Sequence, residues 1–357
     1  MAEPWPAPAV RGLLLYTRAG FESEAEAELG LKGPRYGWSG DMEATRGSGF
    51  VRLRLRTESL AAAPLKILPL DILCFARQRL EIFAEFVDLP RHDRLSPLLE
   101  ALVLFGRPFS DVWLETADTN EAKQLNPLLR ALARPFDQAL RERQLLDERS
   151  PRRLHVFFES GTAVTLGSSP RGDANAWPMG IPRLRFPSGA PSRSTLKLEE
   201  AFQTFLQDPE AWPQPGMSAV DLGAAPGGWT FQLVRRHVRT TAVDNGPIDK
   251  ALLATGLVDH QRCDGFRYRP PKPVDWLVCD IVEQPDRIAQ LVAEWLARGW
   301  CRQAIFNLKL PMKQRWLTVD GCRQRIEKRL KGLQYHLAMK QLYHDREEIT
   351  VYLKRFD

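Results

Sequence analysis

The stretch AVDLGAAPGGW, residues 219–229, decides the fold of this chain. Ala219, Val220 and Leu222 are typical of a short buried parallel strand. The glycine-rich turn 223–228 follows, and the run WTFQLVRR at 229–236 predicts a helix. Strand, glycine-rich turn and helix form the first unit of a doubly wound α/β sheet that binds nucleotides, because glycines let the backbone approach a ligand closely.

The ligand that this turn favours is a cation without phosphate. The turn is not GxGxxG, and the acid Asp221 stands at the end of the strand. An acid there would repel a dinucleotide's pyrophosphate but attract a positive charge. S-adenosylmethionine has no phosphate and carries a sulfonium and an ammonium group, so we interpret the turn as a methyl-donor site. The plain alternative is an ordinary strand–turn–helix with a tight glycine corner.

Size and composition set broad limits. The chain has 357 residues, 44% hydrophobic and 26% charged, with a net charge of +6, which permits a polyanionic partner without requiring one. Its five cysteines contain no CxxC pair, so no metal site or disulfide framework is expected and a reducing cytoplasm fits best. The apolar run before residue 20, LLLY, is too short for a signal peptide, and no apolar stretch of 18 residues occurs, so no membrane contact is expected.

The N-terminal half predicts two small modules and a linker. Short strands and an acidic helix predict an α+β subdomain over residues 1–90. A strand at 112–116, a helix over 125–146 interrupted at Pro135, and a hairpin around Ser160-Gly161 predict a second subdomain over 91–169. We interpret His155, in the hairpin, as structural. The Pro-, Gly- and Arg-rich segment 170–191 is either a linker packed between domains or a surface for single-stranded RNA.

Residues 192–357 alternate strand and helix patterns and predict a Rossmann-like domain. The segment 194–205 predicts a helix with Ser194 as a candidate N-cap, and three runs predict buried parallel strands that end in polar residues. These runs are TTAVD (240–244), VDWLVCD (274–280) and AIFNLK (304–309), and EEITVYLK (347–354) predicts the closing strand. Ligands bind at the carboxyl ends of such strands.

Charged residues at these ends predict a site. Asp244, 21 positions after Gly223, can accept both ribose hydroxyls of a nucleoside. Asp264 could accept the exocyclic adenine N–H. The simpler interpretation is that it is an aspartate that stabilises a turn before Gly265. Four further charged residues would converge on the same rim: Lys197, Asp280, Lys309 and Glu348.

Together with a methyl donor, these four residues suggest methyl transfer to a hydroxyl. Lys309 could take the hydroxyl proton if it is neutral, and its ordinary pKa of about 10.4 would have to fall. Burial, Lys197 and a sulfonium would lower that pKa, whereas Asp280 and Glu348 would raise it, so the sequence leaves the net direction open.

Other methyl-transfer chemistries fit less well. Amino-methylating enzymes place Asn/Asp-Pro-Pro-aromatic where this chain has CDIVEQP, and Cys279 reads as a packing residue rather than a nucleophile. Nine basic residues between Arg302 and Lys331 read either as a rim facing RNA or, for most of them, as a solvated helix face.

The residues also resemble a known family. The catalytic half is similar to FtsJ-like 2′-O-ribose methyltransferases, and the whole chain resembles more closely the bacterial RlmM family of 23S rRNA 2′-O-ribose cytidine methyltransferases. Segments that carry this resemblance include LLLYTRAGFESEAEAEL, AWPMGIPRLRFPSGAPSRSTLKLEEAF, AVDLGAAPGGWT, IFNLKLPMK and LYHDREEITV.

The resemblance implies an N-terminal α+β region of THUMP type that binds RNA, a linker, and a C-terminal Rossmann-like methyltransferase domain. It implies a catalytic tetrad of Lys197, Asp280, Lys309 and Glu348, with Lys309 as proton acceptor. We expect S-adenosyl-L-methionine to contact Ser194, Asp221, Gly223, Ala225, Pro226, Gly227, Gly228, Asp244, Asp264 and Asp280. Glu347 is the alternative to Glu348, and Ser192 the alternative to Ser194.

The expected partner is 23S rRNA, naked or in an early precursor particle, and the expected state is a monomer without a metal. Two other functions remain open. One is an RNA base N-methyltransferase, and the other is a non-catalytic RNA-binding factor in ribosome assembly. A nicotinamide dehydrogenase is disfavoured by APGG in place of GxGxxG.

Overall fold

The computed structural model describes residues 10–56, 65–210 and 212–356. The chain divides into two compact units, residues 1–181 and 182–357. The division falls inside the predicted linker 170–191. Parts of the predicted first subdomain, residues 1–9 and 57–64, lie outside the described ranges. No helix within those ranges is both long and apolar enough to cross a membrane.

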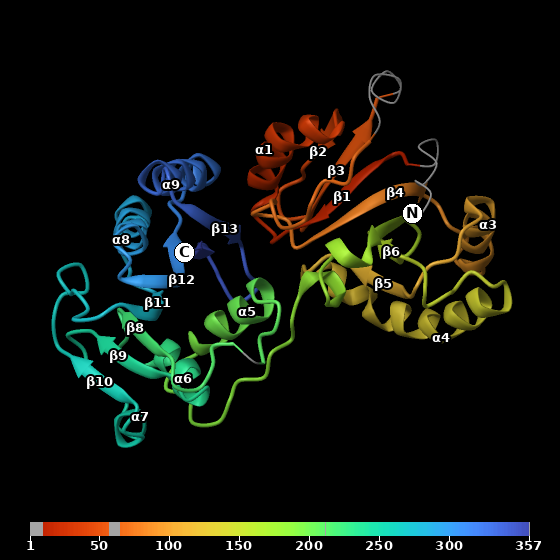
Figure 1. Ribbon diagram of the computed structural model, residues 1–357. Coiled ribbons are helices and arrows are strands. Elements are labelled where there is room, and N and C mark those ends of the chain that lie inside the picture. The colour runs from red at the N-terminus through yellow and green to blue at the C-terminus, as the bar shows by residue number, and fades with distance from the viewer. Residues whose placement is uncertain (1–9, 57–64, 211, 357) are drawn as a thin grey trace. The chain divides into compact units, whose positions relative to one another are not determined.

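The first unit is built on one seven-stranded sheet in the order β2-β3-β1-β4-β7-β6-β5 (Figure 1). All neighbouring strands are antiparallel except β5 and β6. Its strands are β1 Gly12–Tyr16, β2 Gly40–Glu43, β3 Phe50–Leu55, β4 Gln78–Phe86, β5 Val112–Thr116, β6 Arg152–Phe158 and β7 Val164–Pro170. The pairing of β4 with β7 joins the segments predicted as two subdomains into a single sheet.

Within the described part of this unit, three α-helices accompany the sheet: α1 Glu22–Lys32, α3 Leu95–Phe105 and α4 Asn126–Glu142. The predicted interruption at Pro135 is wrong, because α4 runs through it. Pro135 and Ala131, whose carbonyl loses its helical donor, are both exposed, so water can bond that carbonyl. His155 is structural as predicted: it is fully buried, with Nδ1 2.7 Å from Glu115 Oε2 and Nε2 2.7 Å from Ser169 Oγ.

The second unit contains a seven-stranded sheet in the order β10-β9-β8-β11-β12-β14-β13. Its strands are β8 Ser218–Leu222, β9 Arg239–Val243, β10 Val258–Gln261, β11 Val274–Cys279, β12 Cys301–Lys309, β13 Gln334–Lys340 and β14 Glu348–Phe356. The first five are parallel, and β14 runs antiparallel to both of its neighbours. The predicted Rossmann-like α/β fold is therefore confirmed.

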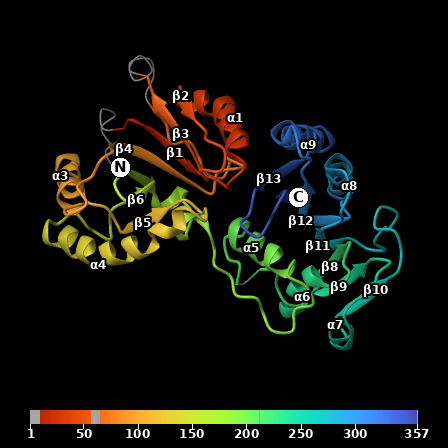
Figure 2. The same ribbon diagram turned by 180° about the vertical axis from the view of Figure 1, so that it is seen from behind.

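Helices cover both faces of this sheet (Figures 1 and 2). One face carries α5 Thr195–Phe205, α6 Gly228–Arg235 and α7 Lys250–Ala254, and the other carries α8 Pro285–Ala297 and α9 Arg315–Arg329. The core under α5 and α6 includes Phe202, Trp229 and Trp276, and all three are at least 97% buried. Because both faces are covered, the central parallel strands β8, β11 and β12 are largely apolar, which made them recognisable in the sequence.

Candidate active site

The site lies where the strand order of the second sheet changes direction. From β8 the chain runs outward through β9 and β10, and then crosses to β11 on the other side of β8. The carboxyl ends of β8 and β11 thus lie at a topological switch point, the usual ligand site of an open α/β sheet. The polar residues that end or follow the strands here are the ones that the sequence singled out.

The turn after β8 requires glycine at two positions. Gly223 has φ +80°, and a Cβ there would lie 2.7 Å from Ile281 Cγ1. Gly227 has φ +116°, and a Cβ there would lie 2.5 Å from Leu252 Cδ1. Any residue with a side chain would therefore be strained at either position, both by the backbone conformation and by the close contact.

The two candidate serines pack against the next glycine of this turn. A Cβ on Gly228 would lie 2.2 Å from Ser194 Oγ and 2.6 Å from Ser192 Oγ. The two hydroxyls are 2.5 Å apart, so the alternative between these serines stays open. Ser194 precedes α5, but the predicted cap is wrong: its side chain makes no cap hydrogen bond, because it faces Ser192 and the turn instead.

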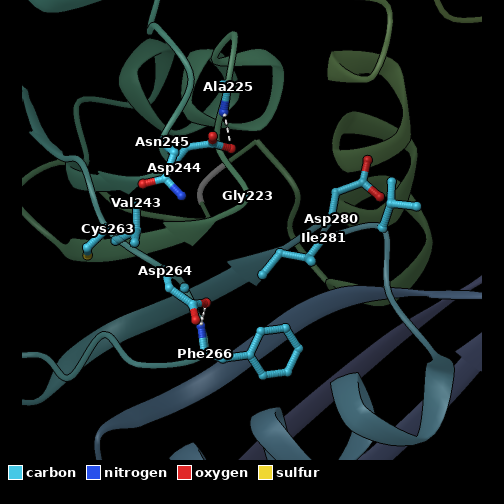
Figure 3. Close-up of a pocket in the computed structure, with 12 residues that line it drawn as sticks. Gly223, Ala225, Val243, Asp244, Asn245, Cys263, Asp264, Phe266, Asp280 and Ile281 are labelled. Carbon is cyan, nitrogen blue, oxygen red and sulfur yellow. Dashed lines mark hydrogen bonds between the residues drawn. The ribbon is translucent and has the colours of Figure 1, made fainter.

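A pocket of about 330 Å³ opens at the switch point (Figure 3). Five of the predicted donor-site residues line it: Gly223, Ala225, Asp244, Asp264 and Asp280. Ser194, Asp221, Pro226, Gly227 and Gly228 are not among its lining residues. The lining therefore brings three carboxylates from three successive strand ends to one cavity.

Asp244 organises one wall of this pocket. Its Oδ2 accepts the Ala225 N–H at 3.1 Å and its Oδ1 accepts the Gly246 N–H at 2.7 Å. Each carboxylate oxygen has two lone pairs, so Asp244 keeps acceptor capacity for a ligand's hydroxyl groups. Asp264 accepts the Phe266 N–H at 2.9 Å, as a turn aspartate does, and also faces the pocket (Figure 3).

Asp221 lies beneath the turn. It is 1% exposed, and Thr230 Oγ1 donates to its Oδ2 at 2.6 Å. Burial raises the pKa of Asp221 to about 7. A group that is partly neutral at physiological pH is a weaker attractor for a cation than the sequence argument assumed.

The structure brings together the four residues of the predicted tetrad. Lys309 Nζ donates to Asp280 Oδ1 at 2.5 Å and to Glu348 Oε1 at 2.8 Å. Lys197 Nζ donates to Glu348 Oε2 at 2.5 Å and lies 3.5 Å from Asp280 Oδ2. Two ammonium and two carboxylate groups thus alternate in one compact cluster, contributed by α5, the end of β11, β12 and β14.

Strand register explains which glutamate joins the cluster. Glu348 is directly opposite Lys309 in the antiparallel β12–β14 pair. The adjacent Glu347 is half-exposed and forms an ion pair with Arg315, with Oε2 2.6 Å from Nη2. Since neighbouring residues of a strand face opposite sides, only one of the two can meet Lys309.

Sequence reasoning missed Asn307, which contacts both carboxylates. Asn307 Nδ2 lies 3.1 Å from Asp280 Oδ1 and 3.0 Å from Glu348 Oε2, and the side chain is fully buried. The sequence did contain a signal for Asn307, because it is a polar amide inside the apolar run AIFNLK. It stands two positions before Lys309 and therefore lies on the same face of the strand.

Opposing effects set the proton affinities of the cluster. Burial disfavours the charged form of Lys309, but Asp280 and Glu348 outweigh burial, so the pKa of Lys309 is raised above its ordinary value. Burial alone would raise the pKa of Glu348, but Lys197 and Lys309 outweigh it and hold that pKa below its ordinary value. Without ligands, the cluster therefore favours charged lysine and charged glutamate.

Two other predictions can be compared with the structure. Cys279 is fully buried, and burial raises the pKa of its thiol to about 12, so it packs as predicted and is no nucleophile. Several residues of the basic segment 302–331 form ion pairs with acidic neighbours, as on a solvated surface: Arg315 with Glu347, Arg323 with Asp320 and Glu327, Arg325 with Asp286, and Arg329 with Glu294.

Three family models match the chain. Residues 10–80 match the RlmM ferredoxin-like domain, residues 93–170 match the N-terminal model of ribosomal RNA large subunit methyltransferase M, and residues 190–307 match the FtsJ-like methyltransferase. The ferredoxin-like description is finer than the α+β region that we expected, and the THUMP assignment stays a prediction.

Full-length relatives agree with these models. The chain is 53% identical to ribosomal RNA large subunit methyltransferase M of Methylococcus capsulatus, covering 96% of this chain and 97% of the relative. The protein of the same name from Cellvibrio japonicus is 50% identical, and the match covers 96% of this chain and 99% of that relative. TrmN from Thermus thermophilus, a solved structure, is 17% identical over 97% of this chain and 99% of that chain, at a TM-score of 0.36 that supports no further conclusion. The chain belongs to the ribosomal RNA large subunit methyltransferase M family.

Proposed function

We propose that this protein methylates the ribose 2′-hydroxyl of a cytidine in 23S rRNA, with S-adenosylmethionine as donor and Lys309 as proton acceptor. The observation that carries the proposal is the double role of Asp280. This carboxylate lines the pocket at the switch point and also accepts the Lys309 ammonium at 2.5 Å. The proposed donor site and the proposed proton acceptor would thus share one carboxylate. The names of the relatives support ribosomal RNA as the substrate.

The pocket fits the chemistry of the proposed donor. Asp244, Asp264 and Asp280 give the pocket an acceptor-rich, negatively charged lining that suits hydroxyls, an exocyclic amine and cationic groups. Asp244 would accept the ribose hydroxyls, and Asp264 would accept the adenine amine. When bound, S-adenosylmethionine supplies an electrophilic methyl group on a positively charged sulfur.

The cluster would position the acceptor hydroxyl and take its proton. Lys309 Nζ, in its neutral form, would accept the proton of the 2′-hydroxyl as the oxygen bonds to the methyl carbon and the bond from that carbon to the donor sulfur breaks, which leaves S-adenosylhomocysteine. Glu348 accepts a hydrogen bond from Lys309 and holds it in place, and Lys197 in turn holds Glu348. Alignment of the hydroxyl with the donor supplies a further part of the rate acceleration.

The raised pKa of Lys309 has to be overcome before this step. A cationic ligand beside Asp280 weakens the field that this carboxylate exerts on Lys309, and RNA that covers the site excludes water. Both changes favour neutral lysine. The donor-bound state is therefore the state in which Lys309 can act as a base.

The product identifies the reaction. We would incubate the protein with methyl-tritiated S-adenosylmethionine and unmodified 23S rRNA, digest the RNA to nucleosides and separate them. We expect the label in 2′-O-methylcytidine, at a linkage that resists alkali. Label in a base would favour the N-methyltransferase, and donor binding without transfer to naked or particle-bound rRNA would favour the assembly factor.

A further inference from the structure

A chain of buried hydrogen bonds continues behind the tetrad, away from the pocket. In the β12–β14 pair, Asn307 is directly opposite Thr350, one step along the same face from the Lys309–Glu348 pair. Asn307 and Thr350 are both fully buried. The cross-strand pair next to the tetrad is thus polar although it lies inside the core.

The carboxylates fix the orientation of the Asn307 amide. Ionised Asp280 and Glu348 can only accept hydrogen bonds, so the amide atom between them has to be the nitrogen, which donates one N–H to each. The amide oxygen then faces Thr350, whose Oγ1 lies 2.8 Å from Asn307 Oδ1. Because an amide oxygen cannot donate, the Thr350 hydroxyl proton must point toward it.

The next link is Asp345. Thr350 Oγ1 lies 2.8 Å from Asp345 Oδ2, and a hydroxyl has only one proton. Since that proton goes to Asn307, Asp345 must donate, and it is therefore protonated. Independently, burial, with Glu348 and Glu200 nearby, raises the pKa of Asp345 well above its ordinary value. Its Oδ2 retains a lone pair for the Leu342 N–H at 3.1 Å.

We propose that Asn307, Thr350 and Asp345 form a positioning relay that holds Asp280 and Glu348 against Lys309 and limits how tightly those carboxylates bind the lysine proton. The three are positioning residues, because they act through the tetrad. The inference rests on the catalytic role proposed above for the tetrad.

The relay acts on Lys309 through shared acceptors. Each carboxylate divides its hydrogen bonding between Asn307 and a lysine, so a weaker Asn307 contact leaves more negative charge for the lysine. Among the described residues, the charged or titratable groups that act on this network include Lys197 and Glu200 from α5, Asp221 from β8, Cys279 and Asp280 at the end of β11, Lys309 from β12, and Asp345 and Glu348 around the start of β14. Loss of the relay would therefore raise the proton affinity of Lys309 and loosen the tetrad.

A matched pair of variants tests the relay in the full-length protein. Thr350→Val removes the hydroxyl with little change in shape, and Thr350→Ser retains it. Tyr352→Phe is the control, because the Tyr352 hydroxyl donates to Gln303 Oε1 at 2.8 Å across the same two strands, away from the tetrad. Donor affinity and melting temperature are measured for each variant.

Two readouts report on Lys309. The first is the pH dependence of single-turnover methyl transfer to 23S rRNA, and the second is NMR titration of the Lys309 amine in lysine-labelled protein. For Thr350→Val we expect a rate about ten- to a hundredfold lower near neutral pH, and both midpoints at higher pH, with donor affinity unchanged within about twofold. Thr350→Ser restores both midpoints, and Tyr352→Phe moves neither.

The outcomes separate this inference from the proposed function. A folded Thr350→Val protein with the wild-type rate and both wild-type midpoints overturns the relay. If Thr350→Val does not fold, Asn307→Ala takes its place with the same expected shifts and the same overturning result. If the wild-type protein transfers no methyl group to RNA, the proposed function fails, whereas the NMR titration still decides whether the relay sets the proton affinity of Lys309.

Discussion

Asp280 and Asp244 have different roles at the site: Asp280 contacts the lysines of the tetrad, and Asp244 shapes the wall of the pocket. Asp280 touches both lysines of the tetrad, whereas Asp244 holds the backbone of the turn and of residue 246 while it faces the pocket. Replacing either aspartate by asparagine would remove at least one of these contacts, because each carboxylate uses both of its oxygens. Substitutions at these positions therefore test separate parts of the account.

Asp244→Asn should weaken donor binding without unfolding the protein. Hydrogen bonds from hydroxyls to a carboxylate are charge-assisted, and their loss costs about 1.5–3 kcal/mol, so the Kd for S-adenosylhomocysteine should rise roughly 10- to 100-fold. Isothermal titration calorimetry measures this change. Asp259→Asn, on β10 and not among the pocket's lining residues, should leave Kd unchanged. Equal affinity in wild type and Asp244→Asn would remove Asp244 from the donor site.

Asp221 should make the protein less stable as pH rises. Its folded-state pKa of about 7 exceeds the ordinary value of 3.8, so between these values the folded state binds a proton that the unfolded state lacks. The free energy of unfolding then falls as pH rises from about 4 to 7, and stays low above 7. The Asp221→Asn variant lacks this titration and should gain up to roughly 3–4 kcal/mol over the wild type between pH 4 and pH 8. Urea unfolding at both pH values measures it, and a pH-independent difference would contradict the assignment.

At the scale of elements, the unit β8–turn–α6 and the pair β12–β14 build the site. The first contributes Gly223 and Ala225 to the lining of the pocket, and the second sets Lys309 against Glu348. Both depend on backbone features: a left-handed glycine in the first, and strand register in the second. Either can be disturbed by changing one residue.

Gly223→Ala should destabilise the protein by about 1–3 kcal/mol, because alanine is strained at φ +80° and its Cβ would clash with Ile281. Gly216→Ala is the matched control: its φ is +84°, but no atom lies within 4 Å of the new Cβ. Thermal denaturation should show a larger loss for Gly223→Ala than for Gly216→Ala. Equal losses would mean that backbone conformation alone, and not the close packing of the turn on Ile281, sets the cost.

Local patterns predicted the strands β8, β9, β11, β12 and β14 of the catalytic half, but not the two edge strands β10 and β13. Buried parallel strands read as apolar runs, and polar residues at their ends, such as Asp244 and Lys309, marked the site edge. The register between β12 and β14 could not be derived from local patterns, because the residues that pair lie far apart in the sequence. Lys309 and Glu348, for example, are 39 positions apart. The Asn307–Thr350 pair was missed for this reason. The β4–β7 pairing and the course of α4 through Pro135 depend on long-range packing and solvent exposure, which local patterns do not contain.

At the scale of the whole molecule, two units of different architecture share one chain. The second unit holds the pocket and the tetrad, and the resemblance assigns RNA binding to the first. Helix α4 of the first unit has exposed Arg130 and Arg134 one turn apart. Exposed arginines of this kind can neutralise phosphates of RNA.

We predict that Arg130→Gln combined with Arg134→Gln weakens RNA binding across all sequences. The logarithm of the binding constant should fall linearly with the logarithm of salt concentration, and the double variant should reduce the slope by about 1–2. Filter binding with a 23S rRNA fragment at several salt concentrations measures the slope. Affinity for S-adenosylhomocysteine should stay the same, and an unchanged slope would place the RNA contacts elsewhere.

The central claim is that Lys309 accepts the proton of the attacking hydroxyl. The most direct measurement is the single-turnover rate of methyl transfer to unmodified 23S rRNA across pH, for the wild type and for Lys309→Ala, at saturating donor. The account predicts a wild-type rate that rises with pH as Lys309 loses its proton, and a Lys309→Ala rate lower by at least about 100-fold with donor affinity retained. A Lys309→Ala protein with the wild-type rate and pH profile would contradict it.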